Sequence, residues 1–296
     1  MANFELIFFL LFNIAVIGIA YVVNQYSRRE CLTQRVEGIR VNRQIKQLLV
    51  DLQQHRGMMA IFLGGDASFK SRIEQKQTAI GLDIAVLDAA PGRELMTKER
   101  WEKICNDWQS LRMEARTLPV EVSFERHTEL IRTVLYLIGD VAEHSQISGA
   151  CAADFHLVDA LWGKLPSVAE SLGKARGIGS GVAAKGHCSS VARTKLRFLE
   201  EHVSKTITYV DNELDHADLS HAASFTQAWQ EAHTAVHEFL RLLDERLLGG
   251  ERPTIDAEHY FSASTKAIEA VFHAFDQASN TLENACTEMA EGKQAI

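Results

Sequence analysis

Two arginines, Arg56 and Arg176, stand where the helical pattern of the chain calls for apolar side chains. A guanidinium on the inner face of a helix keeps its charge and therefore needs partners. Its planar fork donates two parallel hydrogen bonds, which suits a small planar anion. The two residues therefore predict anion binding inside a helical bundle. The alternative is that each arginine pairs with a buried aspartate or glutamate of a neighbouring helix.

The apolar stripes around the arginines have the spacing of a buried helical face, with steps of three and four residues. The first stripe consists of Leu48, Leu52, Arg56, Met59 and Leu63, and the second of Val168, Leu172, Arg176, Gly179 and Ala183. A glycine follows each arginine, Gly57 and Gly177. Glycine gives up about 1 kcal/mol of helix propensity relative to alanine. We expect these two glycines to permit the close approach of a backbone or a ligand.

Several other polar residues are candidates for the same site or for a metal site. His55 precedes Arg56 and is a further donor, although adjacent residues point to different faces of a helix. Anion binding needs additional donors, for which Thr78, Ser180 and Lys185 are candidates. His233 and His237 have a spacing that zinc can use, but the sequence contains no HExxH motif, and we expect a partly solvated pair and no bound metal.

Composition indicates the fold class and excludes several functions. The 296 residues include only 4 prolines, and helix-forming residues fill long segments without alternating strand-type runs, so we predict an all-α protein. A net charge of −8 argues against binding nucleic acid. The sequence has no phosphate loop, nucleophile elbow or kinase signature, so we expect neither an enzyme nor a cofactor. Five cysteines without a CxxC motif indicate free thiols.

The N-terminus predicts a membrane span. Leu6 to Val23 contains 18 residues without a charge, which is about the length that crosses a bilayer. No basic segment precedes it and no cleavage site follows, so we expect an anchor rather than a signal peptide. Basic residues follow the span and none precedes it, so the positive-inside rule places the bulk of the chain in the cytoplasm, at the inner membrane. The alternative is a buried N-terminal core helix.

Turn residues divide the remaining chain into helices of two modules. We predict a transmembrane helix in 1–25, a first helical module in 26–147 and a second in 148–296, each an antiparallel four-helix bundle. The first helix runs from the membrane to Leu63, and the next are expected at 68–87, 97–117 and 121–146. After a connector at 148–164, we expect a helix with Pro166 in its first turn and further helices at 189–214 and 220–248. Thr97 and Thr254 are expected to cap the third and the last helix.

The last helix has a heptad seam. Its two sets of seam positions are Phe261, Ile268, Phe275, Leu282 and Met289, and Thr265, Phe272, Ser279 and Cys286. A seam with this period packs against another helix, within the bundle or in a homodimer. This feature supports an alternative function, in which the chain is a structural or scaffolding membrane protein that acts through this helix.

Two stretches of sequence resemble bacterial helical sensor domains of the nitrate- and nitrite-sensing type and related chemoreceptor input domains. The first is Leu52-Gln-Gln-His-Arg-Gly-Met-Met-Ala60, followed by Leu63-Gly-Gly-Asp66. The second comprises Ser148-Gly149, Asp154, Asp159, Leu165-Pro166, Glu170, Leu172-Gly173 and Arg176-Gly177-Ile178-Gly179. The likeness covers most of residues 40–200 in outline, and His55 stands where the family usually has an acidic residue.

The resemblance implies a sensor whose ligand is nitrate, nitrite or another small anion. We expect Arg56, Arg176, Gly57, Gly177 and His55 to form its ligand site. Receptors of this type usually continue into a second span and an output module, neither of which this sequence contains, so we expect a separate signalling protein or a homodimer to carry the signal. Many relatives hold the domain outside the cytoplasm, which makes a periplasmic location the alternative to the orientation predicted from charge.

Overall fold

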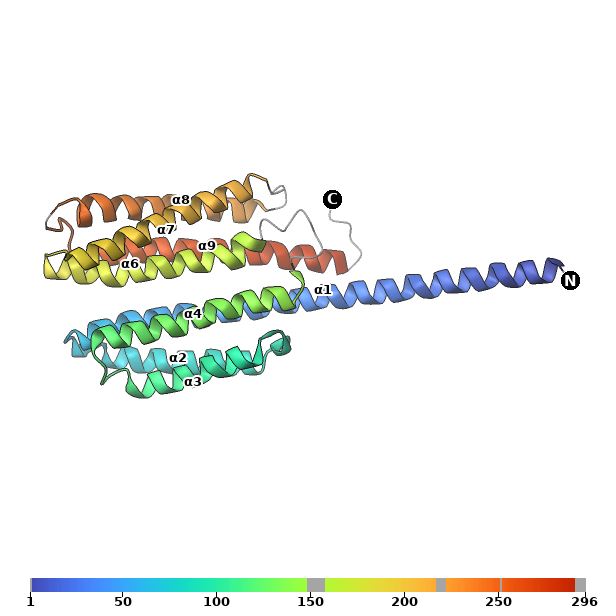
Figure 1. Ribbon diagram of the computed structural model, residues 1–296, viewed down its shortest axis with the longest axis horizontal. Helices are drawn as coiled ribbons and strands as arrows, with labels where there is room; N and C mark the ends of the chain where they lie inside the picture. Colours follow the sequence, from blue (N-terminus) through green and yellow to red (C-terminus); the bar gives the residue numbers. More distant parts are fainter. Residues whose placement is uncertain (1, 148–157, 217–221, 251, 291–296) are drawn as a thin grey trace.

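The chain is all-α in the computed structural model, which describes residues 2–147, 158–216, 222–250 and 252–290 (Figure 1). The side chains of residues 2–8, 10, 159 and 160 lie outside this description. No strand occurs among the described residues. The elements are α1 (Ala2–Leu63), η1 (Ala67–Phe69), α2 (Lys70–Asp88), η2 (Arg93–Leu95), α3 (Lys98–Glu114), α4 (Val120–His144), η4 (Asp159–Lys164), α6 (Leu165–Lys185), α7 (Ser190–Leu214), α8 (Ala223–Leu242), η5 (Leu243–Leu248) and α9 (Ala257–Ala290).

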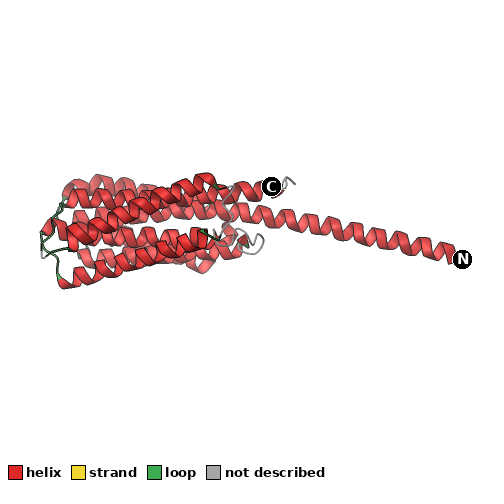
Figure 2. Ribbon diagram, turned by 90° about the horizontal axis from the view of Figure 1, so that it is seen from above, coloured by secondary structure: helices red, strands yellow, loops and turns green. Residues whose placement is uncertain are grey.

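The helices form two groups that lie side by side, with α1 to α4 in one and α6 to α9 in the other (Figure 1). Helix α1 packs on α2 and α4 of its own group and also along α9 of the other. In the second group, α6 and α8 both pack on α9, and α7 covers α6. The N-terminal part of α1 extends alone beyond the bundle in both views (Figure 2). The division at residue 148 into two separate modules stays a prediction. Helix α1 packs against helices of both groups.

Local sequence accounts for how α6 and α7 begin and end, as predicted. Pro166 lies in the first turn of α6, where its missing N–H is no loss. Gly186 ends that helix in the left-handed conformation, with φ of 63°. The Ser189 hydroxyl then accepts a hydrogen bond from the Ala192 N–H at 3.2 Å and caps α7.

Two predicted caps are wrong. The Thr97 hydroxyl makes no capping bond to α3 and instead donates to Asp140 Oδ2 of α4 at 2.6 Å. The Thr254 hydroxyl donates to the Arg246 carbonyl at 3.2 Å, and the Asp256 carboxylate accepts from the His259 N–H at the start of α9. In both cases the hydroxyl bonds to a residue outside the helix that it was predicted to cap. The local sequence does not show this partner.

The other helix boundaries differ from prediction by a few residues. Helix α3 ends at Glu114 rather than near Thr117, and α4 ends at His144. The predicted helix at 220–248 begins at Ala223 and changes to the wider π-helical winding of η5 from Leu243. Of the residues used in the sequence analysis, Ser148, Gly149, Cys151, Asp154 and Ser220 lie outside the described residues, as does the Asp159 side chain.

The heptad seam of α9 is used inside the chain. Ile268, Phe275 and Leu282 are buried, and α9 packs against α6, α8 and α1. Phe261, at the start of the seam, is 39% exposed. The bundle-packing prediction is confirmed, and the buried seam residues are not available as the interaction surface of a scaffold.

Within the described side chains, no helix has a stretch that is both long and apolar enough for a membrane span. The predicted span Leu6–Val23 begins among side chains that lie outside the description.

Candidate functional site

Arg56 is buried and paired with a carboxylate. The side chain is 2% exposed, and its Nη1 and Nη2 donate to Glu170 Oε1 and Oε2 at 2.7 and 3.0 Å. Nη1 also donates to the Thr128 hydroxyl of α4 at 3.0 Å, and the guanidinium lies 4.9 Å from the centre of the Phe124 ring. Of the two possibilities that the sequence left open for Arg56, the structure contains the ion pair with a neighbouring helix.

The Arg56 side chain of α1 packs against one face of α6. Glu170, Gly173 and Gly177 follow one another at three and four residues, so they share a face. A side chain at Gly173 would place Cβ 3.1 Å from Arg56 Nη2, and one at Gly177 would place it 2.9 Å from Phe124 Cε2. The glycines thus make room for Arg56 and for the aromatic ring beneath it.

Arg176 points to α9 and has a different environment. Its Nη1 donates to the Thr265 hydroxyl at 3.0 Å, and its guanidinium lies 4.9 Å from the centre of the Phe261 ring. The residue is 8% exposed, yet among the described residues no carboxylate oxygen lies within 4.0 Å of its nitrogens. Burial, and next the charge of Arg56, lower the Arg176 pKa to about 10. At neutral pH the side chain therefore remains a cation without a bonded anion.

A polar group without a partner lies near this cation along the helix. Ser180 is one turn after Arg176 on α6, and its hydroxyl oxygen is buried without a hydrogen-bond partner in the described structure. On the adjoining face, the Tyr260 ring fills the space over Gly179, and its hydroxyl donates to the Ala175 carbonyl at 3.0 Å. The other predicted donors lie elsewhere: Thr78 is exposed and bonded within α2, and Lys185 is exposed at the end of α6.

His55 faces away from Arg56, into the first group of helices. Its Nδ1 lies 2.8 Å from His127 Nε2, and its Nε2 lies 3.3 Å from the Gln77 amide nitrogen. His127 Nδ1 donates to the Ser123 carbonyl at 2.6 Å, so His127 Nε2 is an acceptor and His55 Nδ1 must donate to it. Burial, and next the neighbouring His127, lower the His55 pKa to about 3. Both rings are neutral, and both nitrogens of His55 are already occupied.

The two predicted glycines differ in what surrounds them. A Cβ at Gly57 would meet no atom within 4 Å, whereas Gly177 faces Phe124. The residues that the sequence analysis missed as site residues are Glu170, Thr128 and Thr265. Glu170 was visible as part of the family pattern, and its spacing from Gly173 and Gly177 marks a helix face with room for a large partner. Nothing in the spacing of Thr128 distinguishes it from other threonines, and Thr265 stood out only as a heptad-seam position of the last helix.

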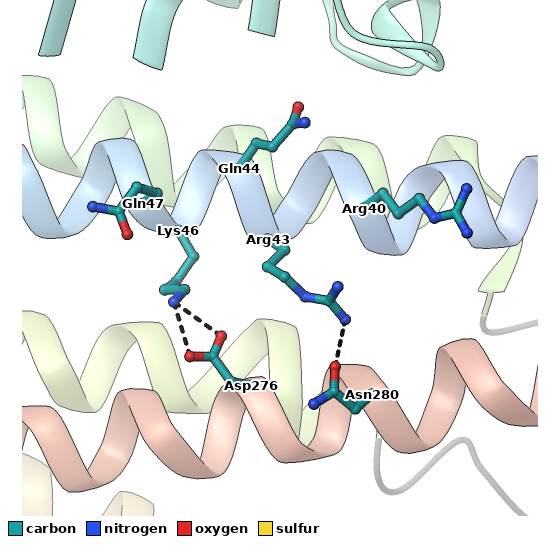
Figure 3. Close-up of a pocket in the computed structure, with 7 residues that line it drawn as sticks. All are labelled: Arg40, Arg43, Gln44, Lys46, Gln47, Asp276 and Asn280. Atoms are coloured by element: carbon teal, nitrogen blue, oxygen red, sulfur yellow. Dashed lines mark hydrogen bonds and ion pairs between the residues drawn. The ribbon is translucent and has the colours of Figure 1, made fainter. Parts of the chain in front are cut away.

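A groove of about 640 Å³ lies between α1 and α9 (Figure 3). Lys46 Nζ lies 2.9 Å from Asp276 Oδ1, and Arg43 Nη2 donates to Asn280 Oδ1 at 3.0 Å. Arg40 and Arg43 both also pair with Glu283 of α9. These cations are neutralised across the groove, unlike Arg176. The lining residues are Arg40, Arg43, Gln44, Lys46, Gln47, Asp276 and Asn280.

The histidine pair on α8 lies outside this region. His233 Nε2 lies 3.3 Å from Asp211 Oδ2, and the rings of His233 and His237 are 4.3 Å apart. No group of three or more metal-ligating side chains suited to a metal ion occurs in the described part of the chain. Cys31, Cys105, Cys188 and Cys286 are free thiols.

A family model described as nitrate and nitrite sensing (NIT) matches residues 47–283, which is most of the chain. The chain belongs to the NIT family. The resemblance predicted from the sequence is confirmed, and the matched region contains both arginines and Glu170 of this NIT chain. No curated protein matches it in sequence. A solved structure of the NasR transcription antiterminator has the same fold, with a TM-score of 0.65 over 95% of this chain and 76% of that chain. Sequence identity to it is 19%, so the likeness concerns the fold.

Proposed function

We propose that this NIT protein senses nitrate or nitrite, which binds at Arg176 with Arg56 beside it. The observation that supports the proposal is the state of Arg176, a buried guanidinium whose only hydrogen-bonded partner among the described residues is the Thr265 hydroxyl. A buried charge without a counter-ion is costly, by several kcal/mol for a single ion. A small anion at this position supplies the missing charge.

The chemistry of the surroundings suits a planar oxyanion. The guanidinium fork donates in one plane to two oxygens. The Thr265 and Ser180 hydroxyls are further donors, and Ser180 has no other partner in the described structure. Of the predicted ligand residues, Arg176, Arg56 and Gly57 enter the proposed site. His55 is bonded within the first group of helices and Gly177 faces Phe124, so we leave both out.

Isothermal titration of the full chain in detergent with potassium nitrate, nitrite and acetate tests the proposal. We expect nitrate or nitrite to bind, and Arg176→Gln to weaken binding at least tenfold. Arg100→Gln is the matched control, because Arg100 also lies over an aromatic ring, Tyr136, but is paired with Asp140. Absence of heat with any of the anions, or equal affinity in Arg176→Gln, contradicts the proposal.

We also propose that the first turns of α1 anchor the protein in a membrane. Residue 9 and residues 11–26 of α1 include many exposed large apolar side chains, among them Phe9 at 65%, Ile17 at 68% and Tyr26 at 71%. Such a surface on an extended helix is unfavourable in water, and the uncharged sequence from Leu6 to Val23 has the length of a span. The arginines that follow favour placing the bundle in the cytoplasm.

Cell fractionation tests this anchor. We expect the full chain in the membrane fraction and a chain lacking residues 2–25 in the soluble fraction. Protease added to intact spheroplasts should leave the bundle uncut if it is cytoplasmic, and digestion of the bundle would instead place it in the periplasm. A full chain that fractionates as soluble contradicts the anchor and leaves the anion proposal intact.

The signal is proposed to be a change in helix packing that a homodimer or a separate output protein detects. A ligand shifts such an equilibrium only by binding one packing more tightly than the other. The two arginines lie on α1 and α6, which belong to different groups of helices, so a ligand between them can alter how the groups pack.

A further inference from the structure

Glu170 is a buried carboxylate whose charge acts on both arginines. It is 3% exposed and forms a two-pronged ion pair with Arg56. Its charge also acts on Arg176, where Glu269 of α9 and then Glu170 raise the pKa against the larger effects of burial and Arg56. Among the described residues, Glu170 is bonded to Arg56, and no carboxylate is bonded to Arg176. An anionic ligand can therefore bond to the Arg176 guanidinium.

The carboxylate of Glu170 has the shape of the proposed ligand. A carboxylate and a nitrate both present two oxygens in a plane to a guanidinium fork. On Arg56 those two oxygen positions are occupied by Glu170 Oε1 and Oε2 at 2.7 and 3.0 Å. An incoming anion near Arg176 also meets repulsion from the Glu170 charge. An anion that binds both arginines therefore competes with Glu170 for the Arg56 donors.

We propose that Glu170 is an internal competitor of the anion ligand. Ligand binding then moves Glu170 away from Arg56 and breaks the ion pair that joins α1 to α6. The proposal rests on the proposed anion-sensing function and assigns the regulation of that site. Because Arg56 is on α1 and Glu170 on α6, the loss of this pair removes one of the links between the two groups of helices.

Two neighbouring side chains determine how firmly Glu170 is held. The Gln53 amide of α1 donates to Glu170 Oε2 at 3.0 Å, which adds a third hydrogen bond from α1 to the same carboxylate. Lys174 Nζ lies 3.6 Å from Oε1 on the other side, one turn along α6, and its side chain is 32% exposed. Lys174 is the partner that can keep the Glu170 charge neutralised after Arg56 has been released.

The test is titration of potassium nitrate into full-length variants at constant ionic strength with potassium chloride. We expect Glu170→Gln to lower the nitrate Kd at least tenfold, because the competing charge is gone. Gln53→Met, which removes one bond to Glu170 without touching Arg56, should lower it by a factor of about two to five. Glu283→Gln is the control, since Glu283 also pairs with arginines of α1 but in the groove with α9, and its Kd should be unchanged.

The outcomes separate this proposal from the proposed function. If the wild type binds nitrate and Glu170→Gln binds it equally or more weakly, Glu170 is not a competitor and the anion site stands. If neither protein binds nitrate, both proposals are wrong. Should Glu170→Gln fail to fold, as judged by circular dichroism, Gln53→Met decides, and an unchanged or raised Kd in that variant overturns the competitor role.

Discussion

Arg56 and Arg176 are both buried but differ in their partners. Arg56 is paired with Glu170, and Arg176 donates to the Thr265 hydroxyl. The sequence predicted that Arg56 and Arg176 are buried, because a helical stripe determines which side chains point inward. It did not predict that Arg56 is bonded to a carboxylate while Arg176 is bonded to none among the described residues. That difference depends on which face of which helix lies opposite, and spacing within one helix contains no information about this.

The chain of hydrogen bonds through His55 and His127 predicts a pH dependence of stability. Both pKa values are lowered in the folded protein, to about 3 and about 4, chiefly by burial, from 6.5 in the unfolded chain. Below pH 6.5 the unfolded state therefore binds protons that the folded state does not, so these residues lower the free energy of unfolding as the pH falls from 6.5 to 4. We expect urea unfolding of the wild type to show this slope.

His127→Leu should weaken the slope and lower the free energy of unfolding at pH 7.5. The variant leaves His55 Nδ1 without a partner in the core and removes the side-chain bond to the Ser123 carbonyl, at a cost of about 1–3 kcal/mol for a buried polar group. The control is His202→Leu on the exposed side of α7, for which we expect a change within about 0.5 kcal/mol. A slope in His127→Leu as steep as that of the wild type would show that the pair is not its source.

At the scale of elements, the sequence predicted the helices well and their caps less well. Glycine and proline positions such as Pro166 and Gly186 act on the backbone directly, so they mark helix ends without knowledge of the surroundings. Thr97 and Thr254 depend on hydroxyl partners, and tertiary contacts decided both. The heptad seam of α9 predicted a packed helix, but spacing alone does not distinguish a partner helix in the same chain from one in a second copy.

Gly57, next to Arg56, and Gly179, three residues after Arg176, give an element-scale prediction. Gly57→Ala should stabilise α1 by about 1 kcal/mol, because a Cβ there meets no atom within 4 Å and alanine favours the helix. Gly179→Ala should destabilise α6 by about 1–3 kcal/mol or more, because its Cβ would fall 2.2 Å from the buried Tyr260 ring. Thermal unfolding of both variants measures this. A stable Gly57→Ala protein with weaker nitrate binding would show that the open side of Gly57 faces the ligand.

At the scale of the whole molecule, α1 connects every feature of the proposal. Its extended start is the proposed anchor, its middle pairs with α9 through Lys46 and Arg43, and its last turns contain Arg56. The sequence predicted that this helix continues from the N-terminal apolar segment to Leu63, and α1 does so. Its packing against both groups could not be predicted from sequence periodicity. The hydrophobic pattern indicates buried faces but not that one helix serves two bundles.

This arrangement predicts where a ligand changes local stability. We expect hydrogen–deuterium exchange with nitrate to slow in α6 around Arg176 and in α9 around Thr265, where the ligand supplies a missing counter-ion. In α1, exchange near Arg56 should change because the pair with Glu170 is lost. Helix α3 packs on α4 and contacts neither arginine, so its exchange should be the same with and without nitrate. A uniform change over all helices would indicate a general salt effect.

The most direct measurement is the crystal structure of the full chain grown with nitrate. We expect a planar anion hydrogen-bonded to the Arg176 guanidinium, with the Glu170 carboxylate moved away from Arg56 and toward Lys174. A structure that binds nitrate elsewhere, or that keeps Arg176 bonded only to Thr265 at saturating nitrate, would contradict this expectation.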